Sequence, residues 1–320
     1  MTGMDASIAA PVSSRRTYVW IAVVAAIVFA IGWPLVIKEG FLLHIAILVL
    51  LYSIGASSLH LILRVGQLSL CHAAFMGLGG YTSALLTTRA GLPFVPAFIA
   101  SFLVPAAAAL IVGPILLRLK GVFFVLITFT FGEIVRMTLN EWQSLTGGAD
   151  GIFRIPPPHP FLQPRLHYYY FALVMAVLCV GAVATLLRSP FGRVIDSIRE
   201  GDRLAESSGV PVFRFKVVTF VIACGLVGLQ GSLQAHYIRY LSPNAYTFLE
   251  SLNFIIMNVI GGVNSLVGPL IGAVFLTSLP EFLRGWVEYQ RFFYGVILVL
   301  VMLYAPGGLV ELACRLGRKR

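Results

Sequence analysis

The sequence predicts an all-α fold: a polytopic integral membrane protein with about ten transmembrane helices. Three observations predict this class. Hydrophobic residues fill 58% of the 320 positions and charged residues only 11%, against ~25% charged in an average soluble protein. Mean hydropathy is +0.91. The apolar residues also form long runs, and about 20 apolar residues suffice to cross the hydrocarbon core as a helix.

The first expected span is 18–37, and it follows Arg15 and Arg16. Basic residues beside an apolar run mark the cytoplasmic side of a membrane helix. A secretion signal is the alternative, but this run is long enough to span and no clear cleavage site follows it. We therefore expect an uncleaved span, with residues 1–17 as a cytoplasmic tail.

Nine further apolar runs complete the set, and charges, glycines or prolines separate them. Run 41–63 stops at Arg64, and run 168–187 opens on three tyrosines, which is typical of an interfacial aromatic belt. Stretches 68–88 and 247–283 contain many glycines and are candidates for broken or re-entrant segments. In chain order the runs are 41–63, 68–88, 92–117, 121–138, 168–187, 217–236, 247–261, 267–283 and 292–305.

The charge distribution predicts the orientation of these spans. If residues 189–216 lie in the cytoplasm, the strongest basic clusters fall on the same side. These clusters are Arg15 with Arg16, Arg64, Arg118 with Lys120, and the tail residues Arg315, Arg318, Lys319 and Arg320. Both termini are then cytoplasmic, with 306–320 as a basic tail, and 139–167 is the longest outer loop.

The stretch 189–216 is unusually polar for this chain. It holds nine charged residues, although the whole chain has only 23 basic and 13 acidic ones. Apolar residues fall near one helical face, and charged residues cover the rest. The apolar ones are Val194, Ile195, Ile198 and Ala205. Gly209 and Pro211 supply a stop, so we expect a short amphipathic helix outside the membrane, with Gly201 as a candidate kink. A solvated connecting loop is the alternative.

Two polar groups inside the spans are candidate functional residues. Gln67 and Ser69 open a glycine-rich span with Gly79 and Gly80, where a broken helix could line a translocation path; tight helix packing is the alternative. Glu133 and Arg136 lie three positions apart in the run 121–138. We expect them to form a structural ion pair rather than a proton relay, because pairing removes most of the cost of a charge in the membrane.

Several function classes lack support in the sequence. There is no H-E-x-x-H or G-x-S-x-G motif and no pair of carboxylates deep in a span, so we expect no catalytic site. The cysteines Cys71, Cys179, Cys224 and Cys314 show no metal-ligand spacing. We expect no metal, cofactor or nucleic-acid partner. A G-x-x-x-x-G-K-[ST] nucleotide motif is also missing.

Four stretches together resemble the permeases of branched-chain amino acid ABC importers, of the LivM type within the LivH/LivM family. They are GQLSLCHAAFMGLGGYTSALL (66–86), FTFGEIVRMTLNEWQSLTGGADGI (129–152), REGDRLAESSGVPVFRFKVVTFVIACGLVGLQGSL (199–233) and GGVNSLVGPLIGA (261–273). The resemblance runs in order over most of residues 41–305, and Thr146-Gly147-Gly148 favours the LivM-like over the LivH-like subunit.

The resemblance implies a transport subunit in the bacterial inner membrane that is not itself an enzyme. Its expected partners are cytoplasmic ATP-binding subunits, a second, LivH-like permease subunit and a periplasmic substrate-binding protein, within the lipid bilayer. It also implies that 189–216 is the coupling segment that docks on the ATPase. The matching positions are Arg199, Glu200, Ala205, Glu206 and Gly209.

The implied substrate is a branched-chain or other apolar amino acid. Urea, short amides and aromatic acids are carried by close relatives in the family and stay open as substrates. A self-sufficient secondary transporter is the alternative function, and it should need carboxylates inside the membrane for ion coupling. A membrane scaffold without transport activity is a third class.

Overall fold

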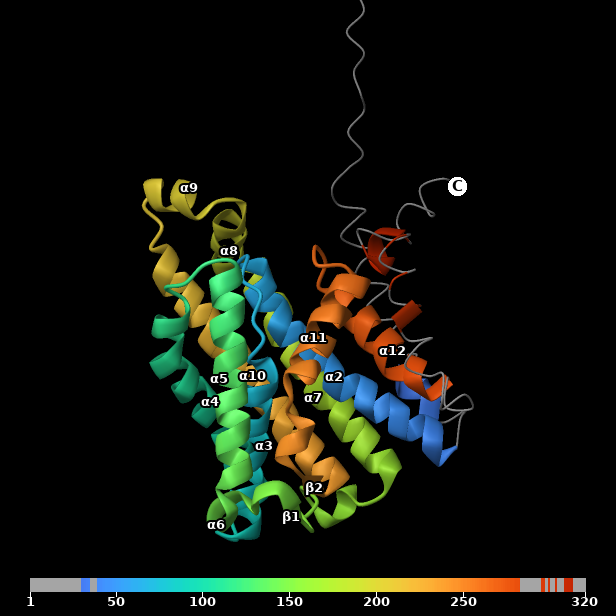
Figure 1. Cartoon of the computed structure of the whole chain (residues 1–320). Helices are drawn as coiled ribbons and strands as arrows, with labels where there is room; N and C mark the ends of the chain where they lie inside the picture. Colours follow the sequence, from blue (N-terminus) through green and yellow to red (C-terminus); the bar gives the residue numbers. More distant parts are fainter. Residues whose placement is uncertain are drawn as a thin grey trace, which may run out of the picture.

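The computed structural model describes residues 30–34, 39–282, 295, 296, 299, 303 and 308–312. Long helices pack side by side as a bundle with two distinct ends (Figure 1). The helices are α2 (Gly40–Arg64), α3 (His72–Thr88), α4 (Phe94–Leu116), α5 (Val122–Glu141), α6 (Gln143–Thr146), α7 (Arg165–Arg188), α8 (Pro190–Glu200), α9 (Asp202–Ser207), α10 (Val212–Ile238), α11 (Phe248–Gly261) and α12 (Val267–Phe282).

The two ends of the bundle differ in structure. Helices α8 and α9 cap one end, which we call the α8–α9 end. The other, the β1–β2 end, carries α6, three 3₁₀ turns (Gly148–Asp150, Pro160–Leu162 and Pro243–Ala245) and the short strands β1 (Ile152–Phe153) and β2 (Tyr240–Leu241). The strands pair antiparallel, with Ile152 opposite Leu241. This pairing ties the predicted outer loop 139–167 to the end of α10.

The predicted class is confirmed, because the described residues are largely helical and five helices are long and apolar enough to cross a membrane. Eight of the ten expected spans each coincide with one helix, from α2 for 41–63 to α12 for 267–283. The expected first and last spans, 18–37 and 292–305, lie mostly outside the described residues, as do the predicted tails.

Burial sorts the long helices into a centre and a periphery. In their most apolar windows, α2 is 67% and α10 is 56% buried, whereas α5 is only 17% buried. Exposed leucine, isoleucine and valine side chains cover the outer faces of α4, α5 and α7. Since a bilayer or a partner membrane subunit can cover such faces, they are consistent with membrane insertion.

Helix α3 begins in the interior rather than at the end of the bundle. After α2 ends at Arg64, residues 65–71 turn back, and the ring of His72 reaches Ser58 of α2, with Nε2 at 2.7 Å from Oγ. Ser58 lies six residues before the end of α2, which is about 9 Å along a helix. Helix α3 itself is continuous from His72 to Thr88, so it contains no break, and a re-entrant course of 68–88 stays a prediction.

Helix α11 begins in the interior in the same way, but from the opposite end. After α10 ends at Ile238, residues 239–247 turn back and place Tyr246 beside Tyr81 of α3, with ring centroids 6.4 Å apart. We call α2, 65–71 and α3 the first unit, and α10, 239–247 and α11 the second unit. The two units run in opposite directions (Figure 1), an inverted arrangement typical of transporter folds.

The two units meet along glycines. A methyl group at Gly79 of α3 would collide with the backbone of Gly228 in α10, and one at Gly231 would collide with the carbonyl oxygen of Met76. Such close approach is possible only without a side chain. The interior is therefore held by backbone-to-backbone packing of α3 on α10.

Candidate functional site

The polar stretch folds as two short helices at the α8–α9 end. Pro190 occupies the first turn of α8, where its missing N–H costs nothing. The backbone is extended at Gly201, which separates α8 from α9, and Gly209 adopts φ +83° after α9. The predicted amphipathic helix is confirmed, and Gly201 is a full break between two helices rather than a kink. We call residues 189–211 the α8–α9 hairpin.

The inner face of this hairpin packs on the membrane-spanning helices. Ile195, Ile198 and Ala205 are almost fully buried in a small cluster with Val65, which follows α2, and Val212, which opens α10. Apolar residues at 191, 194, 195 and 198 give the i, i+3, i+4, i+7 spacing of one helical face. The hairpin is therefore seated on both units and is not a free loop.

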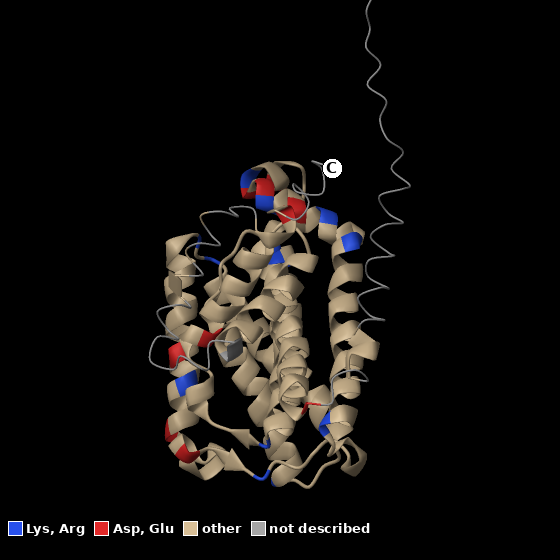
Figure 2. Ribbon diagram, turned by 90° about the vertical axis from the view of Figure 1, so that its right-hand side faces the viewer, with Lys and Arg blue, Asp and Glu red and all other residues tan. Residues whose placement is uncertain are grey.

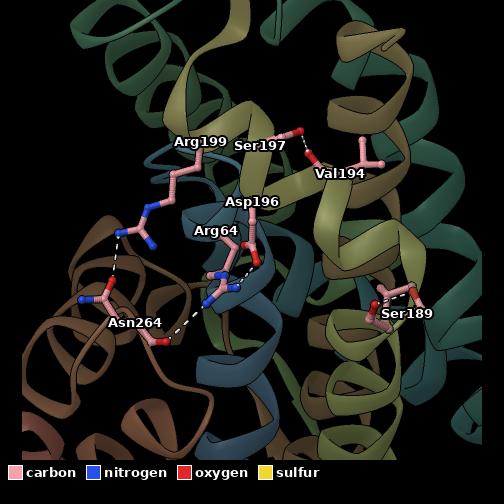
Figure 3. Close-up of polar contacts among 8 residues, drawn as sticks. Arg64, Ser189, Val194, Asp196, Ser197, Arg199 and Asn264 are labelled. Carbon is pink, nitrogen blue, oxygen red and sulfur yellow. Dashed lines mark hydrogen bonds and ion pairs between the residues drawn. The ribbon is translucent and has the colours of Figure 1, made fainter. Parts of the chain in front are cut away.

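Polar contacts join α8 to the first unit (Figure 3). Arg64, the last residue of α2, pairs with Asp196 of α8. The same guanidinium donates to the carbonyl oxygen of Asn264 at 3.2 Å, and Arg199 donates to the Asn264 side chain at 3.2 Å. Asn264 lies in the turn between α11 and α12, so this network connects α8, α2 and the α11–α12 turn.

A second ionic contact joins α9 to the second unit. Asp202 at the start of α9 accepts from Nζ of Lys216 in α10 at 2.7 Å and pairs with Lys120, which precedes α5, at 2.9 Å. Partial burial alone would raise the pKa of the Asp202 carboxyl, but the two lysines outweigh it and hold the pKa below its usual value. Asp202 is therefore ionised at neutral pH.

The outer face of the hairpin is exposed and carries both signs of charge. Charged residues gather at this end, whereas the middle of the bundle is mostly uncharged (Figure 2). Four of the five predicted coupling residues are exposed: Arg199, Glu200, Glu206 and Gly209. The fifth, Ala205, is only 4% exposed and faces the bundle, so in this chain it contributes to seating the hairpin.

One exposed residue on this face was not among the predicted ones. Leu204 in α9 is 69% exposed, although its neighbours Arg203 and Glu206 are polar. A partner that covers this side chain would remove its apolar surface from water, which favours binding. The signal was present in the sequence as a leucine outside the apolar face of the predicted helix.

The predicted path residues are buried in this chain. Gln67 lies at the α8–α9 end beside Lys216 and Phe220, and Ser69 is fully buried with its hydroxyl 3.1 Å from the Cys71 sulfur. Gly79 and Gly80 pack against α10, as described above for Gly79. Packing accounts for both glycines, and a role of the four residues in a path stays a prediction.

The expected ion pair in α5 is confirmed. Nε of Arg136 donates to Glu133 at 2.8 Å, and both side chains are 21% exposed. One turn of helix therefore neutralises both charges within the chain.

A partly buried acidic residue was missed. Glu250 lies in the first turn of α11, and its carboxylate reaches the interior between α2, α10 and α11. It is the only acidic residue between 217 and 261, so an isolated carboxylate inside expected span 247–261 was the available signal. Within the described residues, no group of three or more His, Cys, Asp and Glu side chains could hold a metal ion.

Comparison with known proteins identifies the family. The family model for the permease component of the branched-chain amino acid transport system matches residues 41–302. The chain is 31% identical to the high-affinity branched-chain amino acid transport system permease protein LivM of Escherichia coli, over 90% of this chain and 74% of that protein.

More distant relatives agree with this match. A probable branched-chain amino acid transport permease protein LivM of Methanocaldococcus jannaschii is 24% identical over 74% of this chain and 77% of its own. The LivH permease protein of Escherichia coli is 24% identical over 43% of this chain and 45% of its own. No solved structure gives a significant match. The chain belongs to the family of branched-chain amino acid transport system permease components.

Proposed function

We propose that this chain is the permease subunit of an ATP-driven importer in the bacterial inner membrane, with both termini cytoplasmic, and that it carries branched-chain or other apolar amino acids. The names of its relatives support the substrate class. The observation that carries the proposal is the α8–α9 hairpin. It is seated on both units by its apolar face and by two ionic contacts, and it presents a charged face with an exposed leucine to a partner.

The partner on this face is a separate cytoplasmic ATPase. Arg199, Glu200, Glu206 and Gly209 lie on the exposed side, and Leu204 is the apolar anchor. An exposed leucine in a charged surface fits an apolar recess in a partner, and the surrounding charges give orientation and specificity.

A second, LivH-like permease subunit completes the translocation path. The exposed apolar side chains of α4 and α5 suit contact with either lipid or such a subunit. A periplasmic binding protein delivers the substrate at the β1–β2 end, to the loop 139–167. Gln67 and Ser69 lie beside the path in the segment that leads into α3, and Gly79 and Gly80 hold that helix against α10.

Closure of the ATPase dimer pushes the hairpin, and the contacts described above distribute that movement. Asp196 transmits it to α2 through Arg64, whereas Asp202 transmits it to α10 through Lys216. Rigid helices carry a displacement at one end to the other end of a bundle. Because the two units run in opposite directions, a shift of the hairpin changes how α3 and α11 face each other.

Charge reversal at Glu200 tests the coupling. In Glu200→Lys, we expect the ATPase to be lost from the purified complex and leucine uptake to fall at least tenfold, with the membrane level of the chain unchanged. Glu39→Lys is the matched control, since Glu39 is exposed just before α2 at the other end. Retention of the ATPase and of uptake in Glu200→Lys would contradict this docking surface.

Uptake measurements also test the secondary-transporter alternative. Glu250 makes that test worthwhile, because it places a carboxyl group inside an expected membrane span, where ion-coupled transporters need one. Uptake that continues without any ATPase and collapses with the ion gradient would replace the importer proposal. Uptake that requires ATP hydrolysis by a co-purifying subunit excludes the alternative.

A further inference from the structure

A cluster of polar side chains lies in the interior where the two units meet. Tyr52 from α2, Gln230 and Gln234 from α10, and Glu250 from α11 contribute to it. Tyr52 lies close enough to interact with both Glu250 and Gln234. We call these four residues the Glu250 cluster. Removing polar groups from water costs free energy, so a cluster of them in the interior indicates a structural or functional role.

The cluster leaves hydrogen-bond acceptors unused. Oε2 of Glu250 accepts from Nδ2 of Asn253 at 3.1 Å. The Tyr52 side chain lies within reach of Glu250 and Gln234, but no hydrogen bond of good geometry reaches Oε1 of either residue among the described residues. Gln230 is fully buried, and both polar atoms of its amide are also without a partner there. Buried polar groups are nearly always paired, so these acceptor atoms are suited to take further hydrogen-bond donors.

The backbone makes room for the fully buried amide. A methyl group at Gly55 of α2 would collide with Oε1 of Gln230 and with the ring of Phe254. Gln230 therefore lies next to Phe254, and Phe254 is one helical turn after Glu250 on α11. Gln230 is also one helical turn before Gln234 on α10. The unpaired acceptor atoms therefore belong to one region and not to scattered sites.

In the described part of the chain, no lysine, arginine or histidine forms an ion pair with Glu250. Glu250, Gln234 and Tyr52 are partly exposed, which leaves a way in for a ligand. A ligand that carries a positive charge and several N–H donors matches this set, whereas a carboxylate would be repelled.

We propose that the Glu250 cluster binds a primary ammonium group, with Oε1 of Glu250 and Oε1 of Gln234 as acceptors and the Gln230 amide as a further polar contact. This inference rests on the proposed function, in which that ammonium is the α-ammonium of the transported amino acid. The cluster thereby distinguishes amino acids from aromatic acids without an amine and from neutral urea or amides.

The test uses three small probes on the purified complex of this chain with its permease and ATPase partners, without binding protein. L-leucine carries both an ammonium and a carboxylate, 3-methylbutylamine only the ammonium, and 4-methylpentanoate only the carboxylate. Thermal unfolding is followed as a function of probe concentration, because a ligand that binds the folded state raises the unfolding temperature. We expect stabilisation by leucine and by the amine, and none by the acid.

Variants assign the effect to the cluster. In Glu250→Gln we expect the concentration of amine needed for half-maximal stabilisation to rise roughly ten- to hundredfold, the loss typical of a charge-assisted hydrogen bond. Gln234→Leu should show the same direction with a smaller change, and the matched Glu39→Gln, which is exposed, should behave as wild type. If Glu250→Gln does not assemble, the three-probe comparison on wild type still decides.

The outcomes separate this inference from the proposed function. Stabilisation by the acid but not by the amine, or an unchanged amine response in Glu250→Gln, overturns the ammonium site even if ATP-dependent leucine uptake is intact. Absence of leucine uptake in cells with the whole complex overturns the proposed function, whereas an amine response that depends on Glu250 would still support the site.

Discussion

The first and second units have the same layout but opposite directions and different polarity. In each, a long central helix is followed by a segment that turns back and a short helix that begins in the interior. Residues 65–88 of the first unit carry no charged side chain, whereas 239–261 of the second carry Arg239 and Glu250. The start of α3 is joined to its surroundings by neutral contacts, such as Ser58 with His72 and the amide of Leu70 with Thr128.

The difference lies in the charge at the start of the short helix, and not in how completely polar groups are paired. In the first unit, the buried side-chain atoms without a partner among the described residues are Ser57 Oγ, His60 Nε2, Arg64 Nε, His72 Nδ1 and the Tyr81 hydroxyl. In the second unit they are both polar atoms of the Gln230 amide, the amide oxygen of Gln234 and one carboxyl oxygen of Glu250. Only the second unit therefore combines such atoms with an acidic side chain. Each unit also has its own contact to the hairpin, Arg64 with Asp196 for the first and Lys216 with Asp202 for the second. Four predictions test how far this comparison holds.

The largest effect is expected where the two units cross. In Gly231→Ala, the new methyl group would collide with the carbonyl oxygen of Met76, so α3 and α10 must separate. Overpacking of this kind costs about 1–3 kcal/mol or more, since backbone cannot rotate away. Unfolding temperature and membrane level should both fall. Gly181→Ala in α7 is the control, because nothing lies within 4 Å of a methyl group there. An equal fall in unfolding temperature and membrane level in both variants would show that close packing of α3 on α10 is not the cause.

The next effect concerns the contact of the first unit with the hairpin. Arg64→Ala removes the partner of Asp196 and the donor to the Asn264 carbonyl. We expect ATP-driven uptake to fall several-fold at normal membrane level, because α8 can then move without α2. Lys216→Ala removes the corresponding contact of the second unit, the ion pair with Asp202. Uptake rates measured for both variants show whether both contacts contribute to coupling. An unchanged uptake rate in both variants would show that the contacts of the hairpin with α2 and α10 are not needed for coupling.

A smaller effect tests the neutral character of the first unit. Ser58→Ala removes the hydroxyl 2.7 Å from Nε2 of His72 and should lower the free energy of unfolding by about 1 kcal/mol. Ser57→Ala, one residue away, should change it little, because its buried hydroxyl has no partner among the described residues. Chemical or thermal unfolding of the two variants decides, and a larger loss in Ser57→Ala would mean that this hydroxyl does have a partner.

The smallest effect is a pH dependence at the contact of the second unit with the hairpin. The lysines hold the pKa of Asp202 below its usual value of 3.8, so its folded state binds a proton less readily than its unfolded state. The resulting stability is fully present above that pH and is lost as pH falls through the lowered pKa. Unfolding temperatures of wild type and Asp202→Asn should differ at neutral pH and converge in acid. A difference that persists in strong acid would mean that the carboxylate charge is not its source.

Much of this fold follows from local patterns in the sequence. Run length and hydropathy predict the helices from α2 to α12, because each span must satisfy its own backbone in the bilayer. The spacing of Val194, Ile195 and Ile198 predicts the inner face of the hairpin, and the i, i+3 spacing predicts the Glu133–Arg136 pair. These features depend on neighbours within one or two helical turns.

Other features depend on partners that no local pattern identifies. Arg64 and Asp196 lie 132 positions apart, and nothing around either residue names the other. The inverted units are related by direction and not by visible sequence similarity, so they emerge only once the helices are placed. The proposed role of Glu250 depends on Gln230 and Gln234, which lie twenty and sixteen positions earlier on a different helix, α10.

The amide of Ala73 at the start of α3 donates to the hydroxyl of Ser251 in α11 at 2.9 Å, across 178 positions of sequence. A ribosome completes the first of these residues long before the second. While the rest of the chain is being made, the beginning of α3 sits in the bilayer without its native acceptor, a state that hydrocarbon disfavours. The start of α3 therefore reaches its native hydrogen bonding only after α11 has been synthesised.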